Sequence, residues 1–214
     1  MSASPQTLQN QILNGAAKLD IELNEAQLAA LYAYLELLVK WNKAYNLTAI
    51  REPERMVNLH LLDSLAVHPH IQQAEHIIDV GTGPGLPGIV LAIMNPAKKF
   101  TLLDSNGKKT RFLFQAKTAL QLTNVVIVNG RVEDFKPAQL FDVVVSRAFA
   151  SLADMTQWCA HLLANKGVFL AMKGQYPSDE IAAIAEHYDL IKSVPLAIVG
   201  VEGERHLLTI QPKV

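Results

Sequence analysis

Hydrophobic and polar positions in the first 70 residues alternate with a helical period. Apolar side chains recur at i, i+3, i+4 and i+7 from Leu28 onward, which predicts an amphipathic helix with Asn24 at the N-cap position. A shorter helix is expected over roughly 5–19, and a third over 52–69, where proline suits the first helical turn. Residues 1–70 are therefore expected to form a helical N-terminal region.

The pattern changes near residue 75, where short β-branched runs begin to alternate with helical stretches. Such alternation is typical of βα units that build a largely parallel sheet. A turn region at 199–203 joins two late segments, 189–199 and 206–211, so the sheet is expected to end antiparallel. The expected strands are 77–80, 100–104, 125–128, 142–146 and 168–172, and the expected helices are 86–95, 107–121, 151–163 and 178–187.

Composition and charge exclude several classes of protein. Half of the 214 residues are hydrophobic and 18% are charged, which supplies a core and excludes intrinsic disorder. No apolar run approaches the roughly 18 residues of a membrane span, and the N-terminus lacks a signal-peptide pattern, so we expect a cytoplasmic protein with no membrane partner. A net charge of −1 means that any polyanion must be met by a local patch.

The sequence offers little for metal or disulfide chemistry. The single cysteine, Cys159, cannot form an intramolecular disulfide or a multi-cysteine metal site, and it is expected to be buried packing. His68 and His70 flank a proline without a partner acid, which favours a surface loop over a metal site. We therefore expect no metal.

The sharpest chemical signal is the glycine-rich loop at 79–88, which leaves a predicted strand and enters a predicted helix. Glycines let a ligand approach the main chain, and a helix N-terminus attracts negative charge. Gly83, Gly85 and Gly88 satisfy the G-x-G-x-x-G pattern of dinucleotide folds, and Asp104 lies 19 residues beyond Gly85. This reading predicts NAD, and a tight turn without any ligand is a further alternative.

The same loop also fits the acidic-x-G-x-G-x-G pattern of class I S-adenosyl-L-methionine methyltransferases, through Asp79, Gly81 and Gly83. The Asp79 carboxylate can accept hydrogen bonds from the cofactor's ammonium group, whereas it would repel a diphosphate. Pro84 and Pro87 remove two main-chain donors that a diphosphate would need. We therefore expect S-adenosyl-L-methionine as the cofactor, with an NAD-dependent oxidoreductase as the alternative.

Three residues that follow the next two strands complete the predicted cofactor site. Asp104 closes the second strand, where its carboxylate can accept hydrogen bonds from both ribose hydroxyls; the alternative is a helix N-cap or a solvated strand end. Val132 and Glu133 follow the third strand and suit the adenine edge, although a plain surface turn fits their spacing equally well.

Beyond the loop, stretches distributed along nearly the whole chain resemble the bacterial ribosomal RNA small subunit methyltransferase G family, also called glucose-inhibited division protein B. Because they occur in order, the resemblance is highly specific. The stretches are 40–48 (KWNKAYNLT), 60–64 (HLLDS), 79–88, 103–105 (LDS), 146–148 (SRA), 173–174 (KG) and 204–207 (ERHL).

The resemblance implies a seven-stranded Rossmann-like methyltransferase domain at 71–214 behind the helical region at 1–70. It also implies methylation of N7 of guanine 527, in the 530 loop of 16S ribosomal RNA. Many relatives have alanine at the position of Val132 and proline at that of Val90, and neither departure affects a main-chain contact. Carried over by position, the implied cofactor contacts are Gly81, Leu86, Val132, Glu133 and Arg147.

Methyl transfer to guanine N7 needs no acid or base, because N7 already carries an in-plane lone pair. Catalysis is then chiefly positioning. Arg147 follows the fourth strand in Ser-Arg-Ala-Phe, where amino-nitrogen methyltransferases carry an Asn/Asp-Pro-Pro-aromatic motif, which argues against an exocyclic amine as substrate. Arg147 is expected to contact or position the cofactor, and the alternative is a surface ion pair with an acid such as Glu133.

The best RNA-facing candidate is the segment 98–117, which holds six Lys and Arg against one acid. Lys108, Lys109 and Arg111 begin the predicted helix close to the cofactor, and a solvated helix face is the alternative. Lys173 and Arg205 are further candidates at strand ends. The expected partner is 16S ribosomal RNA or the small ribosomal subunit, the expected state is a monomer, and another S-adenosyl-L-methionine-dependent methyltransferase is the alternative function.

Aromatic side chains offer a second route to RNA. Trp41, Tyr45 and Phe149 have the flat rings that stack on an unpaired base in readers of single-stranded RNA. The helical spacing of Trp41 and Tyr45 favours packing in the core instead.

Overall fold

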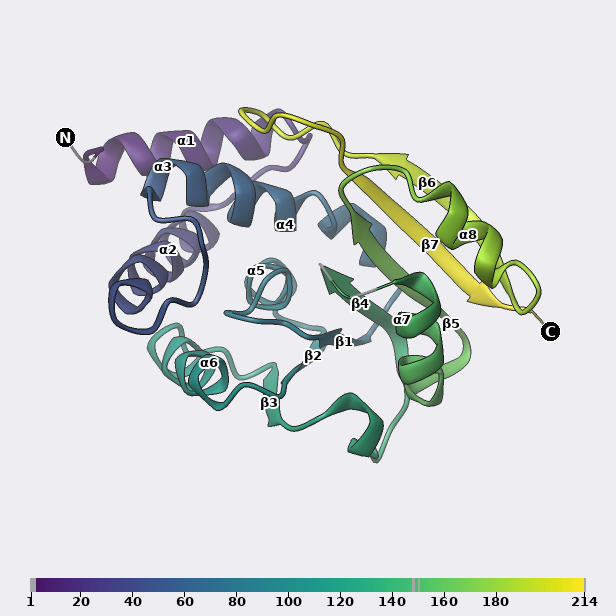
Figure 1. The fold of residues 1–214 in the computed structure, drawn as a ribbon. Coiled ribbons are helices and arrows are strands. Elements are labelled where there is room, and N and C mark those ends of the chain that lie inside the picture. Colours follow the sequence, from purple (N-terminus) through teal and green to yellow (C-terminus); the bar gives the residue numbers. More distant parts are fainter. Residues whose placement is uncertain (1–2, 148, 150, 214) are drawn as a thin grey trace.

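A seven-stranded sheet runs through the molecule in the order β3-β2-β1-β4-β5-β7-β6 (Figure 1). This computed structural model describes residues 3–147, 149 and 151–213. Strands β1 to β5 pair in parallel, and β7 pairs antiparallel with both β5 and β6. The expected mostly parallel sheet with an antiparallel last strand is therefore confirmed. The strands are β1 (His76–Val80), β2 (Lys99–Asp104), β3 (Val125–Asn129), β4 (Phe141–Arg147), β5 (Leu163–Lys173), β6 (Tyr188–Pro195) and β7 (His206–Pro212).

Helices precede the sheet and connect its strands. The N-terminal ones are α1 (Pro5–Ala17), α2 (Glu25–Tyr45), α3 (Pro53–Met56), the π-helical turn η1 (Val57–Leu62), α4 (Asp63–Leu65) and η2 (His68–Ile71). The later ones are α5 (Gly88–Met94), α6 (Gly107–Ala119), η3 (Val132–Asp134), α7 (Leu152–Cys159), η4 (Ala160–Leu162) and α8 (Ser178–Ile184).

Local sequence signals explain how α2 begins and ends. The Asn24 side chain accepts a hydrogen bond from the Gln27 amide at 2.8 Å, and the Gln27 side chain accepts one from the Asn24 amide at 3.0 Å. This reciprocal capping box confirms Asn24 as the N-cap. Asn46 ends the helix in the left-handed conformation, with a φ of 50°, which asparagine tolerates.

The helix expected over 52–69 is helical from Pro53 to Leu65, but its middle turn, η1, is π-helical, and it ends before the separate 3-10 helix η2. Apolar spacing does not distinguish a wider π turn from an α-helical one, and such turns are frequent at functional sites. The helix expected over 151–163 likewise ends early, at Cys159, because β5 already begins at Leu163.

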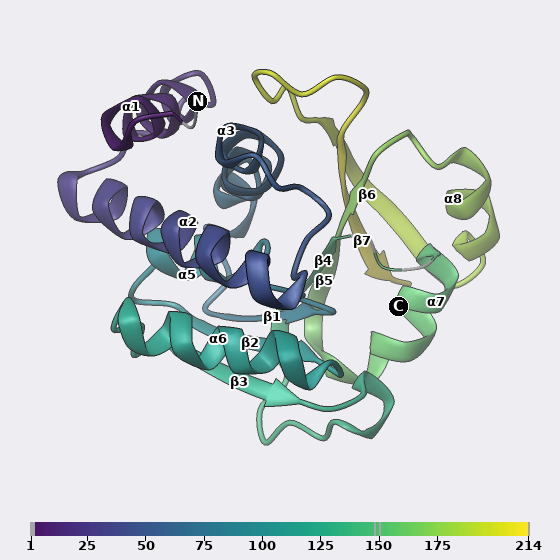
Figure 2. The same cartoon turned by 60° about the vertical axis from the view of Figure 1, so that its left-hand side comes forward.

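The helices form layers on the two faces of the sheet. On one face α5 and α6 pack against the strands and α2 lies across both helices, while α7 and α8 lie on the other face (Figure 2). Buried residues of α2 such as Leu31 and Leu35 share one apolar core with Ile89 of α5 and Phe112 of α6. The helical N-terminal residues and the sheet therefore share a core.

A second core lies under α7, where Cys159 is buried as expected. Burial raises the pKa of its thiol to about 12. Across the described residues, no helix is both long enough and apolar enough to cross a membrane.

Candidate active site

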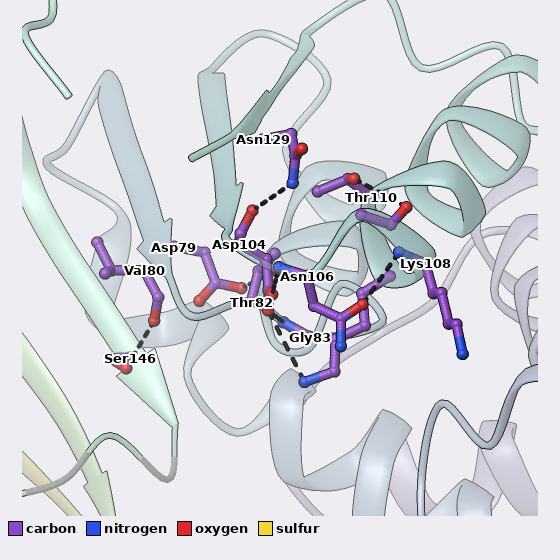
Figure 3. A network of polar contacts seen from close by, with 12 residues as sticks. Asp79, Val80, Thr82, Gly83, Asp104, Asn106, Lys108, Thr110, Asn129 and Ser146 are labelled. Carbon is purple, nitrogen blue, oxygen red and sulfur yellow. Dashed lines mark hydrogen bonds and ion pairs between the residues drawn. The ribbon is translucent and has the colours of Figure 1, made fainter. Parts of the chain in front are cut away.

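The loop after β1 folds tightly against the carboxyl ends of β1 and β2 (Figure 3). Gly81, Gly83 and Gly85 have φ values of +69°, +61° and +100°, which side chains other than glycine rarely adopt. A Cβ atom on Gly88 would collide with Leu102. The glycines are thus required for the loop's path, before any ligand is considered.

The Asp79 side chain, at the end of β1, stabilises this loop through hydrogen bonds. Its Oδ2 accepts hydrogen bonds from the Thr82 hydroxyl at 2.6 Å and the Gly88 amide at 2.8 Å. Burial raises the pKa of Asp79 to about 6, against the opposing effects of these two bonds and of Arg147. Its Oδ1 is buried and accepts no hydrogen bond from any described residue. One carboxylate oxygen is therefore structural, and the other is left for a donor.

Every main-chain amide of the loop is already used inside the protein. The amides of Gly81 and Thr82 donate to the Leu103 carbonyl, and those of Gly85 and Leu86 donate to the Thr82 carbonyl. The Gly83 amide donates to Asp104, the Gly88 amide to Asp79, and the two prolines have no amide hydrogen. The loop therefore offers no donors to a diphosphate, which argues against the NAD reading.

Asp104 closes β2 beside the loop. Its Oδ2 accepts the Gly83 amide at 2.8 Å, its Oδ1 accepts the Asn106 amide at 2.8 Å, and Lys109 Nζ lies 3.9 Å from Oδ2. Each carboxylate oxygen can accept a second bond, so the group remains able to bind hydroxyls. The N-cap of α6 is Asn106, which makes the alternative reading of Asp104 as a helix cap wrong.

A pocket of about 240 Å³ opens above Asp104. Carboxylates and aromatic rings together line it, a composition that suits a nucleoside with its hydroxyls and flat base. The lining residues that matter here are Gly81, Asp104, Val132, Glu133, Phe149 and Trp158. No sequence pattern indicates Trp158, whose ring meets Phe149 edge to face at 5.6 Å between centroids.

Two residues of the predicted cofactor set do not line this pocket. Leu86 is 2% exposed and packs in the core, so it supports the loop from behind. Arg147 lines a second pocket on the other side of β4. Conversely, Lys109, predicted to face RNA, lines the first pocket and lies near Asp104.

The second pocket has a volume of about 480 Å³ and a charged floor. Arg147 Nη1 donates to the Leu59 carbonyl at 3.0 Å and to Asp63 Oδ2 at 3.1 Å. Arg205 Nε lies 3.7 Å from Asp63 Oδ1. Arg147 therefore pairs with Asp63, and the alternative pairing with Glu133 is wrong. Ala148, which follows Arg147 in the family-like stretch, lies outside the described residues.

Burial and the neighbouring arginines have opposite effects on the pKa of the Asp63 carboxyl group. Burial raises the pKa of Asp63, while Arg147 and Arg205 act in the opposite direction.

His60, one turn before Asp63, is also buried, and burial lowers its pKa to about 4. His60 Nδ1 donates to the Leu59 carbonyl at 3.0 Å, so Nε2 accepts from the Thr48 hydroxyl at 2.8 Å. His60 is therefore neutral and structural.

The remaining residues predicted to contact RNA differ in their exposure and in their partners. Lys108 and Arg111 are exposed on the first turns of α6. Lys173 Nζ donates to Glu180 Oε2 at 2.7 Å at the end of β5. Trp41 packs against Phe112 in the core, with 5.8 Å between ring centroids, and Tyr45 stacks outside it, 42% exposed.

Comparison with known proteins gives full-length matches. A family model described as "rRNA small subunit methyltransferase G" matches residues 27–208. "Ribosomal RNA small subunit methyltransferase G" of Cellvibrio japonicus is 55% identical over 217 residues, covering 100% of this chain and 99% of the relative. The protein of the same name from Ectopseudomonas mendocina is 51% identical, covering 95% of this chain and 96% of the relative.

Solved structures with a similar fold are methyltransferases. Mitomycin 7-O-methyltransferase MmcR has a TM-score of 0.62 at 16% identity, covering 75% of this chain and 56% of its own. The ribosomal protein L11 methylase of Lactobacillus delbrueckii subsp. bulgaricus has a TM-score of 0.57 at 16% identity, covering 72% of this chain and 78% of its own. At such low identity these likenesses show the fold alone.

Proposed function

The chain belongs to the rRNA small subunit methyltransferase G family, and from this premise we propose that it methylates N7 of guanine 527 in the 530 loop of 16S ribosomal RNA. Family membership makes it an S-adenosyl-L-methionine-dependent methyltransferase of small-subunit ribosomal RNA. The atom, the nucleotide and the residue roles below are the proposal.

The observation that carries the cofactor assignment is the full internal use of the loop amides beside an open carboxylate pocket. Asp104 would accept the ribose hydroxyls, and the main chain near Val132 and Glu133 would read the adenine edge. Phe149 and Trp158 add apolar surface to the same pocket. These residues fit a nucleoside without a phosphate, which is what S-adenosyl-L-methionine presents.

The methionine end of the cofactor carries a carboxylate and an ammonium group, and each needs a partner in the protein. Since the loop amides are engaged, the partner of the cofactor's carboxylate would be a cationic side chain, and Arg147 lies at this edge of the sheet. Among its bonds to described residues, Arg147 uses Nη1 alone, which leaves Nη2 and Nε for the cofactor. Asp79 Oδ1, which is buried and accepts no hydrogen bond from a described residue, would accept one from the ammonium group.

When bound, S-adenosyl-L-methionine supplies an electrophilic methyl group: the N7 lone pair bonds the methyl carbon while the carbon–sulfur bond breaks with its electrons on sulfur. The protein needs to move no proton. Its residues hold the two reactants in line, an effect that contributes up to about 7 to 11 kcal/mol in well-oriented reactions. Both pockets open at the end of β4, where Arg147 lines one and Phe149 the other.

Transfer of radiolabelled methyl groups tests the function class. Small subunits and large subunits from a strain without this methylation would be incubated with the enzyme and labelled S-adenosyl-L-methionine. We expect incorporation into 16S RNA only, and comparison with free 16S RNA would show which form of the substrate is used. Label in neither RNA, despite cofactor binding, would contradict the proposal and favour another S-adenosyl-L-methionine-dependent reaction.

A further inference from the structure

The pocket beside β4 is a built site whose floor is a carboxylate. Its volume of about 480 Å³ lies within the range of about 300 to 1,000 Å³ typical of sites for small ligands. The wall is formed by the ends of β4, β5 and β7 together with η1 and α4. An unstacked base can enter a pocket of this size from a single-stranded loop.

Asp63 lines this pocket, and one of its two carboxylate oxygens is buried without a hydrogen-bond donor among the described residues. Its side chain is 6% exposed, and its Oδ2 is held by Arg147. Its Oδ1 accepts no hydrogen bond from the described part of the chain, and Arg205 Nε, at 3.7 Å, is beyond hydrogen-bonding distance. A buried carboxylate oxygen without a donor is costly, so its environment points to a ligand that brings an N–H group.

The pocket is lined by basic groups, but Asp63 does not suit a phosphate. Arg147 and Arg205 both lie against Asp63, the one acid among the lining residues, and Lys173 is paired with Glu180 beside the pocket. A phosphate placed on the floor would meet the Asp63 carboxylate at close range, which is repulsive. A neutral base with a donor edge would instead satisfy Asp63 while its own phosphates remain near the cations.

We propose that Asp63 recognises the target guanine, accepting a hydrogen bond from its 2-amino group on Oδ1. This inference rests on the proposed function and names the residue that recognises the substrate base. Adenine has no 2-amino group, and cytosine and uracil lack N7, so this contact and the reacting atom together select guanine.

The arrangement also keeps N7 accessible. Arginine usually grips guanine through O6 and N7 together, which would block the nucleophile. Here Arg147 Nη1 is held by Asp63 and the Leu59 carbonyl, and the proposed function assigns Nη2 and Nε to the methionine carboxylate, so no pair of N–H groups is left for that grip. As the methyl group bonds to N7 the purine becomes positively charged, and a hydrogen bond to a carboxylate strengthens. Asp63 therefore binds the transition state better than the substrate.

Removing one functional group from the RNA tests the contact while the enzyme stays unaltered. Inosine lacks only the 2-amino group of guanosine. Small subunits would be reconstituted with 16S RNA carrying guanine or inosine at the target position. We expect kcat/KM of the wild-type enzyme to fall about 10- to 100-fold with inosine, the usual effect of losing a hydrogen bond to a charged group. Equal rates on the two substrates would overturn the proposal.

Variants then locate the contact. In Asp63→Asn the amide oxygen stays with Arg147 and the amide nitrogen faces the pocket, so the inosine penalty should shrink to less than about threefold. The matched control is Glu204→Gln, which removes an exposed negative charge beside Arg205 and should keep the full penalty. Binding of S-adenosyl-L-methionine by Asp63→Asn should equal that of wild type.

The outcomes separate the inference from the function on which it rests. A full inosine penalty in Asp63→Asn, or a large loss of its cofactor affinity, would overturn the role of Asp63 while leaving methylation of guanine intact. Absence of methyl transfer by the wild-type enzyme to the guanine substrate would instead overturn the proposed function.

Discussion

The hydroxyl of Tyr34 in α2 donates a 2.8 Å hydrogen bond to the carbonyl oxygen of Pro84 in the glycine loop, and both groups are buried. A helix from the N-terminal region thus contacts the loop that borders the proposed cofactor pocket. The helical residues support the site rather than form a separate appendage.

Tyr34→Phe removes this bond and leaves the Pro84 carbonyl buried without its donor. We expect the free energy of unfolding to fall by about 1 to 3 kcal/mol and affinity for S-adenosyl-L-methionine to fall several-fold. Tyr32→Phe is the matched control, because the Tyr32 hydroxyl bonds to exposed Glu36. Chemical denaturation and calorimetric titration would measure both effects, and unchanged values for Tyr34→Phe would contradict the supporting role.

Asp104→Asn replaces a carboxylate that orders the loop and faces the predicted ribose. We expect the dissociation constant for S-adenosyl-L-methionine to rise at least about tenfold, since hydrogen bonds to charged groups are the stronger ones. Asp142→Asn controls for loss of a structural carboxylate, because Asp142 accepts the Glu75 and His76 amides where β4 begins. Equal cofactor affinities of the two variants would refute the ribose assignment.

Arg147→Ala leaves the Asp63 carboxylate buried without its hydrogen-bonded partner. Breaking a buried ion pair is strongly destabilising, and we expect a loss of about 3 kcal/mol. The double variant Arg147→Ala/Asp63→Asn should recover much of this stability without recovering activity. Thermal and chemical unfolding of Arg147→Ala, Asp63→Asn and the double variant would test the coupling, and additive losses would show that the two residues act independently.

Asp79 should make stability depend on pH in a predictable direction. Its pKa of about 6 in the folded protein exceeds its ordinary value of 3.8, so the folded state holds a proton that the unfolded state has lost between these values. The stabilising contribution is complete below about pH 4 and is lost as the pH rises through 6. Asp79→Asn cannot titrate, so the free energy of unfolding of wild type relative to this variant should fall across that window. A constant difference from pH 4 to pH 8 would contradict the raised pKa.

Lys108 and Arg111 on α6 are expected to contact RNA phosphates. Replacing either with alanine should lower the slope of log affinity against log salt by about 0.9, the value for one phosphate contact on a duplex and an upper guide for a loop. Lys117→Ala, at the other end of the same helix, should leave the slope unchanged. Filter binding at several salt concentrations would measure the slopes, and identical slopes for all three variants would mean that α6 presents only a solvated face.

Much of the fold follows from local sequence signals. β-branched runs and the glycine loop placed the strands and their connections, and the Asn24 cap placed the start of α2, because each depends on neighbouring residues. The two pockets depend instead on long-range contacts. Asp63 and Arg147 are 84 positions apart, and no periodicity predicts that a π turn and a strand end will bring them together.

Residue types were easier to predict than their partners. Asp104, Val132 and Glu133 line the pocket expected for them, because carboxyl ends of parallel strands meet at one edge. Lys109 was predicted to face RNA with Lys108, but successive helical residues point in directions about 100° apart, and Lys109 turns toward Asp104. Its charge therefore lies in the pocket beside Asp104.

Aniline scission of 16S RNA after reaction tests the central claim most directly. Aniline cuts the chain where N7-methylguanine has formed, so it reports both the atom and the nucleotide. We predict one new cut, at guanine 527 in the 530 loop, that requires both the enzyme and S-adenosyl-L-methionine. Methyl incorporation without scission, or a cut elsewhere in the RNA, would contradict the account.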